Sequence, residues 1–179
     1  MAKKVFKVDI LSPSSLEKLK NDLLDYKNDL NRKCALMTEL LAQKGVEVAN
    51  VKIGESPLGK YVSVHTNILP DVAGTRAIII ATGAVKQSEG FADFNTLLAV
   101  EFGAGIYHNA VANPKAGEFG LGVGTFPGQI HAFENGWWYW DENSQSWRYT
   151  HGVKATMPMY SASMEIVSSV VEVARSVFK

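Results

Sequence analysis

The chain has 179 residues, of which 46% are hydrophobic and 20% are charged, and its 18 basic and 18 acidic residues give a formal net charge of zero. This length and composition predict one soluble globular domain, and the lack of a basic excess argues against a protein that binds duplex nucleic acid. The single cysteine, Cys34, excludes an internal disulfide and a cysteine-rich zinc site. Because no apolar run is long enough for a signal peptide or a membrane span, we expect synthesis and folding in a cytoplasm.

A long amphipathic helix is predicted near the start of the chain. Ser12 is a good N-cap residue and Pro13 suits the first helical position. Apolar or semi-apolar residues then recur at steps of three and four: Leu16, Leu19, Leu23, Tyr26, Leu30, Cys34, Met37 and Leu41. We expect a helix over residues 13–44 that ends at Gly45 or continues as far as Ala49.

Three segments in the first half of the chain have the composition of strands. Residues 5–10 are a candidate for a short first strand. Residues 60–69 alternate around Val62 and Val64, and residues 76–82 contain three consecutive isoleucines. Their β-branched residues and the Pro-Asp-Val-Ala-Gly-Thr linker between them predict two antiparallel strands.

A short helix and a glycine-rich loop are predicted next. The aromatic and leucine residues at helical steps predict a helix that ends at Gly103, with a strand as the competing prediction: Phe91, Phe94, Leu98 and Phe102. Glycines then accumulate at positions 103, 105, 117, 120, 122, 124 and 128. This density predicts a long functional loop, but no lysine precedes Thr125 as a phosphate-binding loop requires.

The last third of the chain predicts a hairpin and a helix. The aromatic residues 137–140 and the segment 146–150 flank a polar turn. Thr156 can cap a final helix with Pro158 in its first turn, and apolar residues follow at helical spacing: Tyr160, Met164, Val167, Val171, Ala174 and Phe178. Together the elements predict a single α+β domain, with an antiparallel sheet packed against a long N-terminal helix and a C-terminal helix. Residues 103–136 form a glycine-rich loop insertion in it.

Glu101 is the main candidate for chemistry, because it lies between apolar neighbours. It could act as a general base, but a structural role is favoured, in which it pairs with an arginine or caps backbone N–H groups of the glycine loop. None of the four histidines lies in a metal-binding motif. An enzyme with a discontinuous site around Glu101, His108 and His131 is therefore the least favoured alternative, and we expect no catalysis, no metal and no cofactor.

The aromatic run allows three interpretations. It can cover the core of the domain, anchor a protein partner, or stack on sugars or choline-type cations. Residues 135–140 and Trp147 resemble one choline-binding repeat of cell-wall proteins. Those modules need several tandem copies and this chain has one, so a glycan- or choline-binding module is the alternative function.

The order of motifs over nearly the whole chain resembles a known family. The long helix and two strands are followed by Val-Glu-Phe-Gly-Ala-Gly (residues 100–105), Gly-Thr-Phe-Pro-Gly-Gln (124–129), the aromatic hairpin and a helix that starts through Ala-Thr-Met-Pro-Met (155–159). This order resembles the minor tail, or tail-completion, proteins of long-tailed phages and prophages of Gram-positive bacteria. Glu-Phe-Gly-x-Gly is the best-preserved segment of that family and the Pro-x-Met start of the last helix is the second, whereas Gly-Thr-Phe-Pro-Gly-Gln belongs to a subset.

The resemblance implies a structural virion protein that is not an enzyme. Such proteins complete or terminate the tail at its head-proximal end and join it to the neck, as a symmetric oligomeric ring (a head–tail connector) around the DNA channel. The implied partners are further copies of the chain and neighbouring tail-tube, tail-terminator or neck proteins, with DNA only as passive cargo and no membrane. The implied location is the tail or neck of the virion, after synthesis in the host bacterial cytoplasm. The same resemblance also allows a headless, tail-like bacteriocin particle in place of a phage.

A ring built by a head-to-tail repeat needs two different surface patches on each subunit. The glycine loop and the aromatic hairpin are expected to supply one patch, and the far end of the first helix the other. The hypothesis for the partner interface comprises thirteen residues of the loop and hairpin: Glu101, Phe102, Gly103, Gly105, Gly124, Phe126, Pro127, Gly128, Trp137, Trp138, Tyr139, Trp140 and Trp147.

Overall fold

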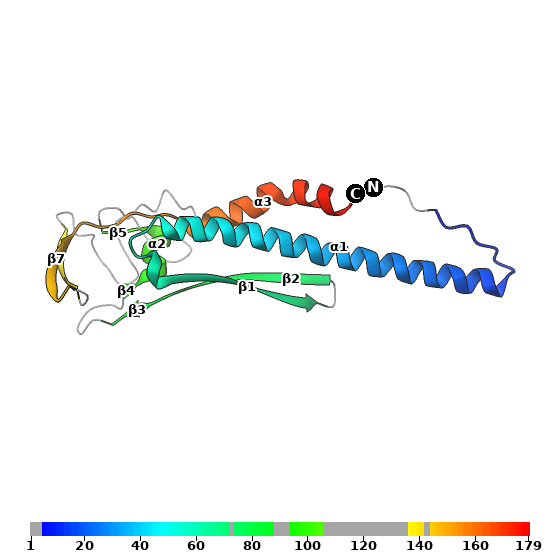
Figure 1. Ribbon diagram of the computed structural model, residues 1–179, viewed down its shortest axis with the longest axis horizontal. Helices are drawn as coiled ribbons and strands as arrows, with labels where there is room; N and C mark the ends of the chain where they lie inside the picture. The colour runs from blue at the N-terminus through cyan, green and yellow to red at the C-terminus, as the bar shows by residue number, and fades with distance from the viewer. Residues whose placement is uncertain (1–4, 72–73, 88–93, 106–135, 142–143) are drawn as a thin grey trace.

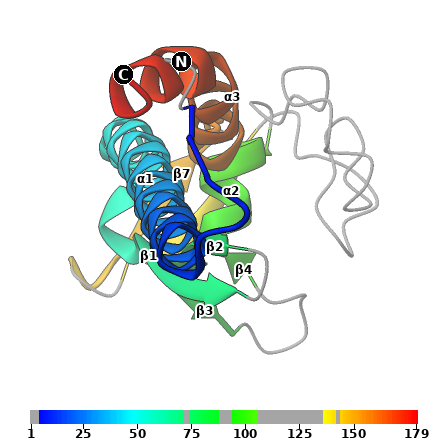
Figure 2. The ribbon, with the colours of Figure 1, turned by 90° about the vertical axis from the view of Figure 1, so that its right-hand side faces the viewer.

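The computed structural model describes residues 5–71, 74–87, 94–105, 136–141 and 144–179. Three layers make up its body (Figures 1 and 2). The long helix α1 (Pro13–Gly54) lies in the middle, α3 (Pro158–Val177) covers one side of it, and the hairpin of β1 (Val62–Asp71) and β2 (Gly74–Gly83) covers the other. The protein therefore has the predicted α+β fold, with an antiparallel sheet, a long N-terminal helix and a C-terminal helix.

The start of α1 is as predicted, but its end is not. The Ser12 side chain accepts a hydrogen bond from the Ser15 N–H at 3.3 Å, and Pro13 occupies the first helical position. The helix continues through Gly45 to Gly54. A Cβ atom on Gly45 would lie 2.7 Å from Ile166 Cδ1 of α3 and 2.8 Å from an isoleucine Cδ1 of β2. This glycine therefore lets the three layers approach one another, and it does not end the helix.

The β1–β2 hairpin confirms the two predicted strands. Its register runs without a bulge from Val62 opposite Gly83 to Asp71 opposite Gly74. Alternate residues of each strand face α1, and on the opposite face the hydroxyls of Ser63 and Thr82 lie 2.8 Å apart. The strands are β-branched and almost free of charge, which suits a sheet with one covered face.

The remaining elements are short: η1 (Gly59–Tyr61), β3 (Val85–Lys86), β4 (Phe94–Asn95), α2 (Thr96–Phe102), β5 (Ala104–Gly105), β6 (Trp137–Asp141), β7 (Ser146–Thr150) and β8 (Gly152–Val153). Within the described residues, each of these strands has one antiparallel partner, in the pairs β3–β4, β5–β8 and β6–β7. The predicted short helix is confirmed as α2, although Phe94 precedes it in β4. Asn95 caps α2, because its side-chain oxygen accepts from the Leu97 and Leu98 N–H groups at 2.9 and 3.3 Å.

The segment before α1 is not the strand that residues 5–10 were expected to form. Residues 5–9 have no regular structure, and the segment doubles back along the first half of α1 (Figure 1). The Phe6 and Tyr26 rings meet edge to face at 6.4 Å, and the Asp9 N–H donates to Ser15 Oγ at 2.9 Å. Phe6 packs on the helix while Val5 and Ile10 stay exposed, so the apolar pattern alone could not specify a strand here.

The core lies beside the second half of α1. Its buried positions on α1 are Ala42, Gly45, Ala49 and Ile53, and those on α3 are Pro158, Ala162, Ser169 and Val173. The 42 residues of α1 span about 63 Å, whereas the 20 residues of α3 span about 30 Å and a ten-residue strand about 33 Å. The two outer layers therefore cover only half of α1, and its first half projects beyond them (Figure 1).

Candidate assembly surfaces

A buried carboxylate joins the end of α2 to the start of α3. Glu101 is only 7% exposed, and its two carboxylate oxygens accept hydrogen bonds from the backbone N–H groups of Met159 at 2.8 Å and Tyr160 at 3.0 Å. Both donors belong to the first turn of α3, whose N–H groups have no partner within the helix. The negative charge also lies at the positive end of the helix dipole. Glu101 therefore caps α3 from a different element.

This contact corrects the expected start of the last helix. The N-cap of α3 is Met157, which has a left-handed backbone (φ 51°, ψ 54°) and makes no side-chain capping hydrogen bond. Thr156, the predicted cap, instead donates its N–H to the Val100 carbonyl at 2.9 Å. The expectation failed because a helix N-terminus can be satisfied by a distant carboxylate as well as by a local hydroxyl. We call the group of Val100, Glu101, Thr156, Met159 and Tyr160 the α2–α3 joint.

The glycines after Glu101 continue this joint as a small sheet. Gly103 ends α2 with φ 79°, a conformation that favours glycine, and its N–H donates to the Ala99 carbonyl at 3.0 Å. Ala104 and Gly105 then pair with β8 in the order Ala104–Val153 and Gly105–Gly152. Phe102 is buried at 4% exposure. The described contacts of these predicted interface residues lie within the chain, and their role toward a partner stays a prediction.

Several predicted site residues lie outside the described part of the chain. They are Gly124, Phe126, Pro127 and Gly128, together with His108 and His131 of the alternative enzyme site. The hypotheses on these residues stay predictions.

The predicted aromatic hairpin is confirmed as β6–β7. Its register places Trp138 opposite Tyr149 and Trp140 opposite Trp147, and Trp137 and Tyr139 also lie on β6. The Trp138 and Tyr149 rings meet edge to face at 5.3 Å.

Three aromatic side chains of the hairpin share one exposed face. Trp138 is 62% exposed, Trp147 64% and Tyr149 46%. Trp147 and Tyr149 are two residues apart on one strand and Trp138 is paired with Tyr149, so all three point to the same side. We call these three residues the aromatic face; it lies at the end of the molecule opposite the first turn of α1 (Figure 1). Arg148 and Asp141, on the other side of the hairpin, form an ion pair at 3.1 Å.

A second apolar surface runs along α3. Met164, Val167 and Val171 are 53%, 71% and 58% exposed, and Val170 is also exposed. Met164, Val167 and Val171 belong to the stripe that the helical spacing indicated. The face of α3 that packs on α1 instead includes Ala162, Ser169 and Val173. Sequence reasoning missed this inner face because Ala162 and Ser169 are small and interrupt its apolar pattern. The signal that could have indicated this face is the set of small residues on α1 that let another helix approach closely: Ala42, Gly45 and Ala49.

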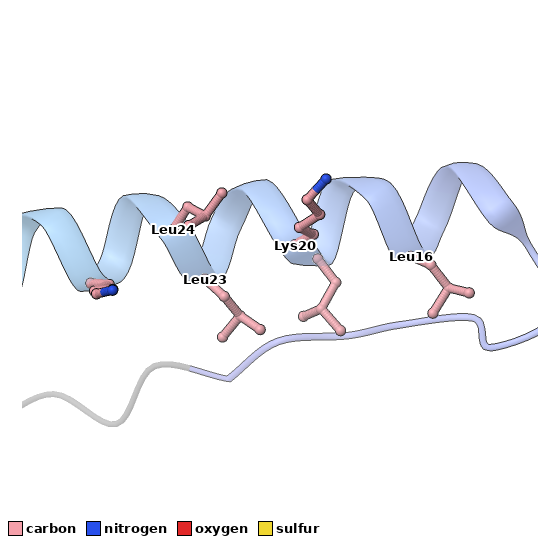
Figure 3. Close-up of a pocket in the computed structure, with 6 residues that line it drawn as sticks. Leu16, Lys20, Leu23 and Leu24 are labelled. Carbon is pink, nitrogen blue, oxygen red and sulfur yellow. The ribbon is translucent and has the colours of Figure 1, made fainter.

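A third apolar surface covers the projecting half of α1. Five of its leucine and tyrosine side chains are exposed: Leu16, Leu23, Leu24, Tyr26 and Leu30. Four leucines and two lysines line an open groove of about 410 Å³: Leu16, Leu19, Lys20, Leu23, Leu24 and Lys27. Leu16 and Leu23 point toward residues 5–12, and Lys20 and Leu24 point to the other side (Figure 3). Four positions of the predicted stripe are therefore exposed in the first half of the helix: Leu16, Leu23, Tyr26 and Leu30.

The described part of the chain offers few clusters of polar side chains for a ligand. It contains no group of three or more histidine, cysteine or acidic side chains that could hold a metal ion. On the projecting half of α1, hydrogen bonds from Lys33 and Arg32 hold the pKa of Asp29 below its ordinary value of 3.8. None of the helices in the described ranges is long and apolar enough to cross a bilayer.

Comparisons with protein-family models, with curated proteins and with solved structures found no match to this chain.

Proposed function

We propose that this chain is a structural subunit at the head-proximal end of a phage tail, where it completes or terminates the tail and joins it to the neck as part of a ring. The observation that carries the proposal is the presence of separate exposed apolar surfaces at opposite ends of an elongated molecule. One end bears the aromatic face and the other bears the leucines of α1.

Exposed apolar surface of this kind favours assembly. Contiguous exposed apolar patches mark interaction sites, and tryptophan and tyrosine are enriched among the residues that contribute most to binding. Two different patches on one subunit are what a head-to-tail contact requires, and such contacts close into rings when the rotation between subunits allows it. A net charge of zero adds little repulsion between neighbouring copies.

The α2–α3 joint supports the family resemblance. The Glu-Phe-Gly-x-Gly segment and the Pro-x-Met start of the last helix are the two best-preserved segments of the tail-completion proteins, and in this chain they meet through the hydrogen bonds of Glu101 to Met159 and Tyr160. A carboxylate with both oxygens engaged by a helix N-terminus has a structural use, which favours a subunit over an enzyme with Glu101 as its base. The proposed partners are further copies of the chain and tail-tube, terminator or neck proteins, with DNA passing through the ring.

Deletion of the gene from the phage or prophage that carries it, with complementation by the intact chain, tests the proposal. Electron microscopy of the lysate is expected to show filled heads and separate tails, and complementation is expected to restore joined particles. A peptide tag fused after Lys179 of the complementing chain allows the chain to be detected in joined particles by immunoblot. Normal joined particles in the deletion strain would exclude the proposed role.

A glycan- or choline-binding module is the second candidate, and the exposure of Trp138 and Trp147 favours it. Cation–π binding needs aromatic rings that are open to a ligand, as these two are. Titration of the protein with choline and with cell-wall fragments, followed by tryptophan fluorescence, distinguishes this function. A saturable change that Trp147→Ala removes would support it, and an unchanged spectrum would exclude it.

A further inference from the structure

Two helical apolar surfaces are exposed to solvent, and their apolar side chains have the same spacing. The surface on α1 is only partly covered by residues 5–12, because Leu16 and Leu23 stay 45% and 47% exposed beside them. On the projecting half of α1, Leu16, Leu23 and Leu30 recur every seven residues. On the outer face of α3, Met164 and Val171 are also seven residues apart, with Val167 between them. Apolar side chains at this spacing form the seam along which two helices pack side by side.

The same copy cannot bring these surfaces together. The outer face of α3 points away from α1, because the opposite face of α3 packs on the second half of α1. The projecting half of α1 lies beyond the end of α3 (Figure 1). A contact between the two surfaces therefore has to form between two copies, and it leaves the same two surfaces available at the ends of the pair.

The charges beside the two surfaces are complementary. Lys20 and Lys27 line the groove on α1 and are seven residues apart. Glu165 and Glu172 directly follow Met164 and Val171 on α3 and have the same separation. Glu172 is exposed, whereas Glu165 is half-buried, accepts a hydrogen bond from Ser169 Oγ at 2.7 Å and lies 4.0 Å from Lys44 of its own copy, so Glu172 is the more accessible of the two. Lys20 also pairs with Glu17 of its own helix at 3.3 Å, and both of these side chains are 65% exposed. In a contact between two copies, the equal spacing of the lysines on α1 and the glutamates on α3 favours α3 as the partner of α1 over a second lysine-lined α1 helix.

We infer that the projecting half of α1 in one copy packs along the outer face of α3 in the next copy, so that the chain assembles head to tail through two helices. This inference rests on the proposed function, because a ring subunit needs a heterologous contact. It adds which surfaces meet and assigns the aromatic face to a different neighbour.

Disulfide cross-linking tests the contact in the full chain. In a Cys34→Ser background, one preparation carries Leu23→Cys and a second, with a different tag, carries Val167→Cys. Both positions are exposed, and unchanged far-ultraviolet circular dichroism establishes that the variants fold. A disulfide requires Cα atoms within about 7 Å, so it reports a direct contact. The mixed preparations are expected to give a cross-linked pair that neither preparation gives alone.

Charge reversal provides the matched control. Lys20→Glu with Lys27→Glu is expected to reduce the cross-linked fraction about tenfold, which corresponds to about 1.4 kcal/mol. Lys18→Glu with Arg32→Glu changes the net charge equally on the opposite side of the helix and is expected to leave the fraction unchanged. Adding Glu172→Lys to the Val167→Cys preparation is expected to recover part of the loss.

The other outcomes overturn the contact. A cross-linked pair from Leu23→Cys alone would mean that two α1 helices pair, and an oligomer without any cross-link would mean that other surfaces assemble. Both results would contradict the inference and leave the tail function standing. A chain that stays monomeric and uncross-linked at high concentration would also contradict it. The deletion experiment is independent of these results, so the two proposals fail separately.

Discussion

The Glu101 carboxylate accepts a hydrogen bond of 2.8 Å from the backbone N–H of Met159, a residue 58 positions later in the chain. Its other oxygen accepts from Tyr160. The end of the short helix α2 is thereby connected to the start of α3, although the glycine-rich segment and the aromatic hairpin separate the two helices in the sequence. Glu101 therefore fixes the N-terminus of α3 to the end of α2, in addition to the packing of α3 on α1.

Glu101→Gln is expected to lower the free energy of unfolding by about 1.5–3 kcal/mol, the range for hydrogen bonds to charged groups. The amide retains one acceptor oxygen but directs an N–H₂ donor at a backbone N–H, and it removes the charge from the helix dipole. Urea denaturation measures the change. Glu172→Gln, an exposed glutamate on α3, is the control and should change stability by less than about 0.5 kcal/mol. Equal effects of the two substitutions would contradict the capping role.

Gly83→Ala is expected to cost about 1–3 kcal/mol, because the new Cβ would lie 2.6 Å from the Leu97 backbone nitrogen, which cannot move without shifting α2. Gly54→Ala serves as the control. A Cβ at Gly54 meets nothing within 4 Å, and alanine is the better helix residue by about 1 kcal/mol, so this variant should be unchanged or more stable. Thermal unfolding of both variants measures the difference. A Gly83→Ala variant as stable as Gly54→Ala would disprove the close approach of β2 and α2.

Val173→Ala is expected to cost about 1.5–3 kcal/mol and Val167→Ala less than about 0.5 kcal/mol, although both valines lie on α3. Val173 is 4% exposed and packs toward α1, whereas Val167 is 71% exposed. The gain in helix propensity is the same in both variants, so the difference reports burial alone. Equilibrium denaturation of a dilute sample makes the comparison. If Val167→Ala were the more damaging change, the assignment of the inner and outer faces of α3 would be reversed.

The Asp29 carboxyl is expected to titrate below 3.8, because hydrogen bonds from Lys33 and Arg32 favour its charged form. A pKa lowered by folding stabilises the folded state above pH 3.8, and this stabilisation is lost as the pH falls through the folded-state pKa. Carbon-13 NMR of the side-chain carboxyl measures the midpoint. Lys33→Gln should move it back toward 3.8, and high salt should do the same by screening. A midpoint at or above 3.8 in the unmodified protein would refute the ion pairs.

Much of the fold could be predicted because it depends on local patterns. The Ser12–Pro13 start of α1, the β-branched strands on either side of the turn near Pro70, and the aromatic hairpin are all specified by neighbouring residues. The predicted stripe of α1 also specified a helix longer than its partners. What the local pattern could not specify was which part of that stripe is covered, because this depends on the lengths of α3 and the hairpin.

The errors arose where tertiary contacts replaced local ones. Gly45 lies inside the helix, where its missing side chain leaves room for one isoleucine of α3 and one of β2. Thr156 does not cap α3, because the carboxylate of Glu101 accepts the hydrogen bonds from the first turn of that helix. Met164, Val167 and Val171 of the predicted stripe on α3 are exposed, because the opposite face of the helix, with Ala162, Ser169 and Val173, packs on α1. For Glu101, the sequence indicated a structural acceptor of backbone N–H groups, but the donors came from α3 and not from the glycine loop.

Cryo-electron microscopy of the intact particle tests the central claim most directly. The proposed function predicts a ring of copies of this chain at the junction between tail and neck, with α1 and α3 of adjacent copies in contact and the DNA channel at its centre. A complete tail and neck in which every density is accounted for by other proteins would contradict the claim.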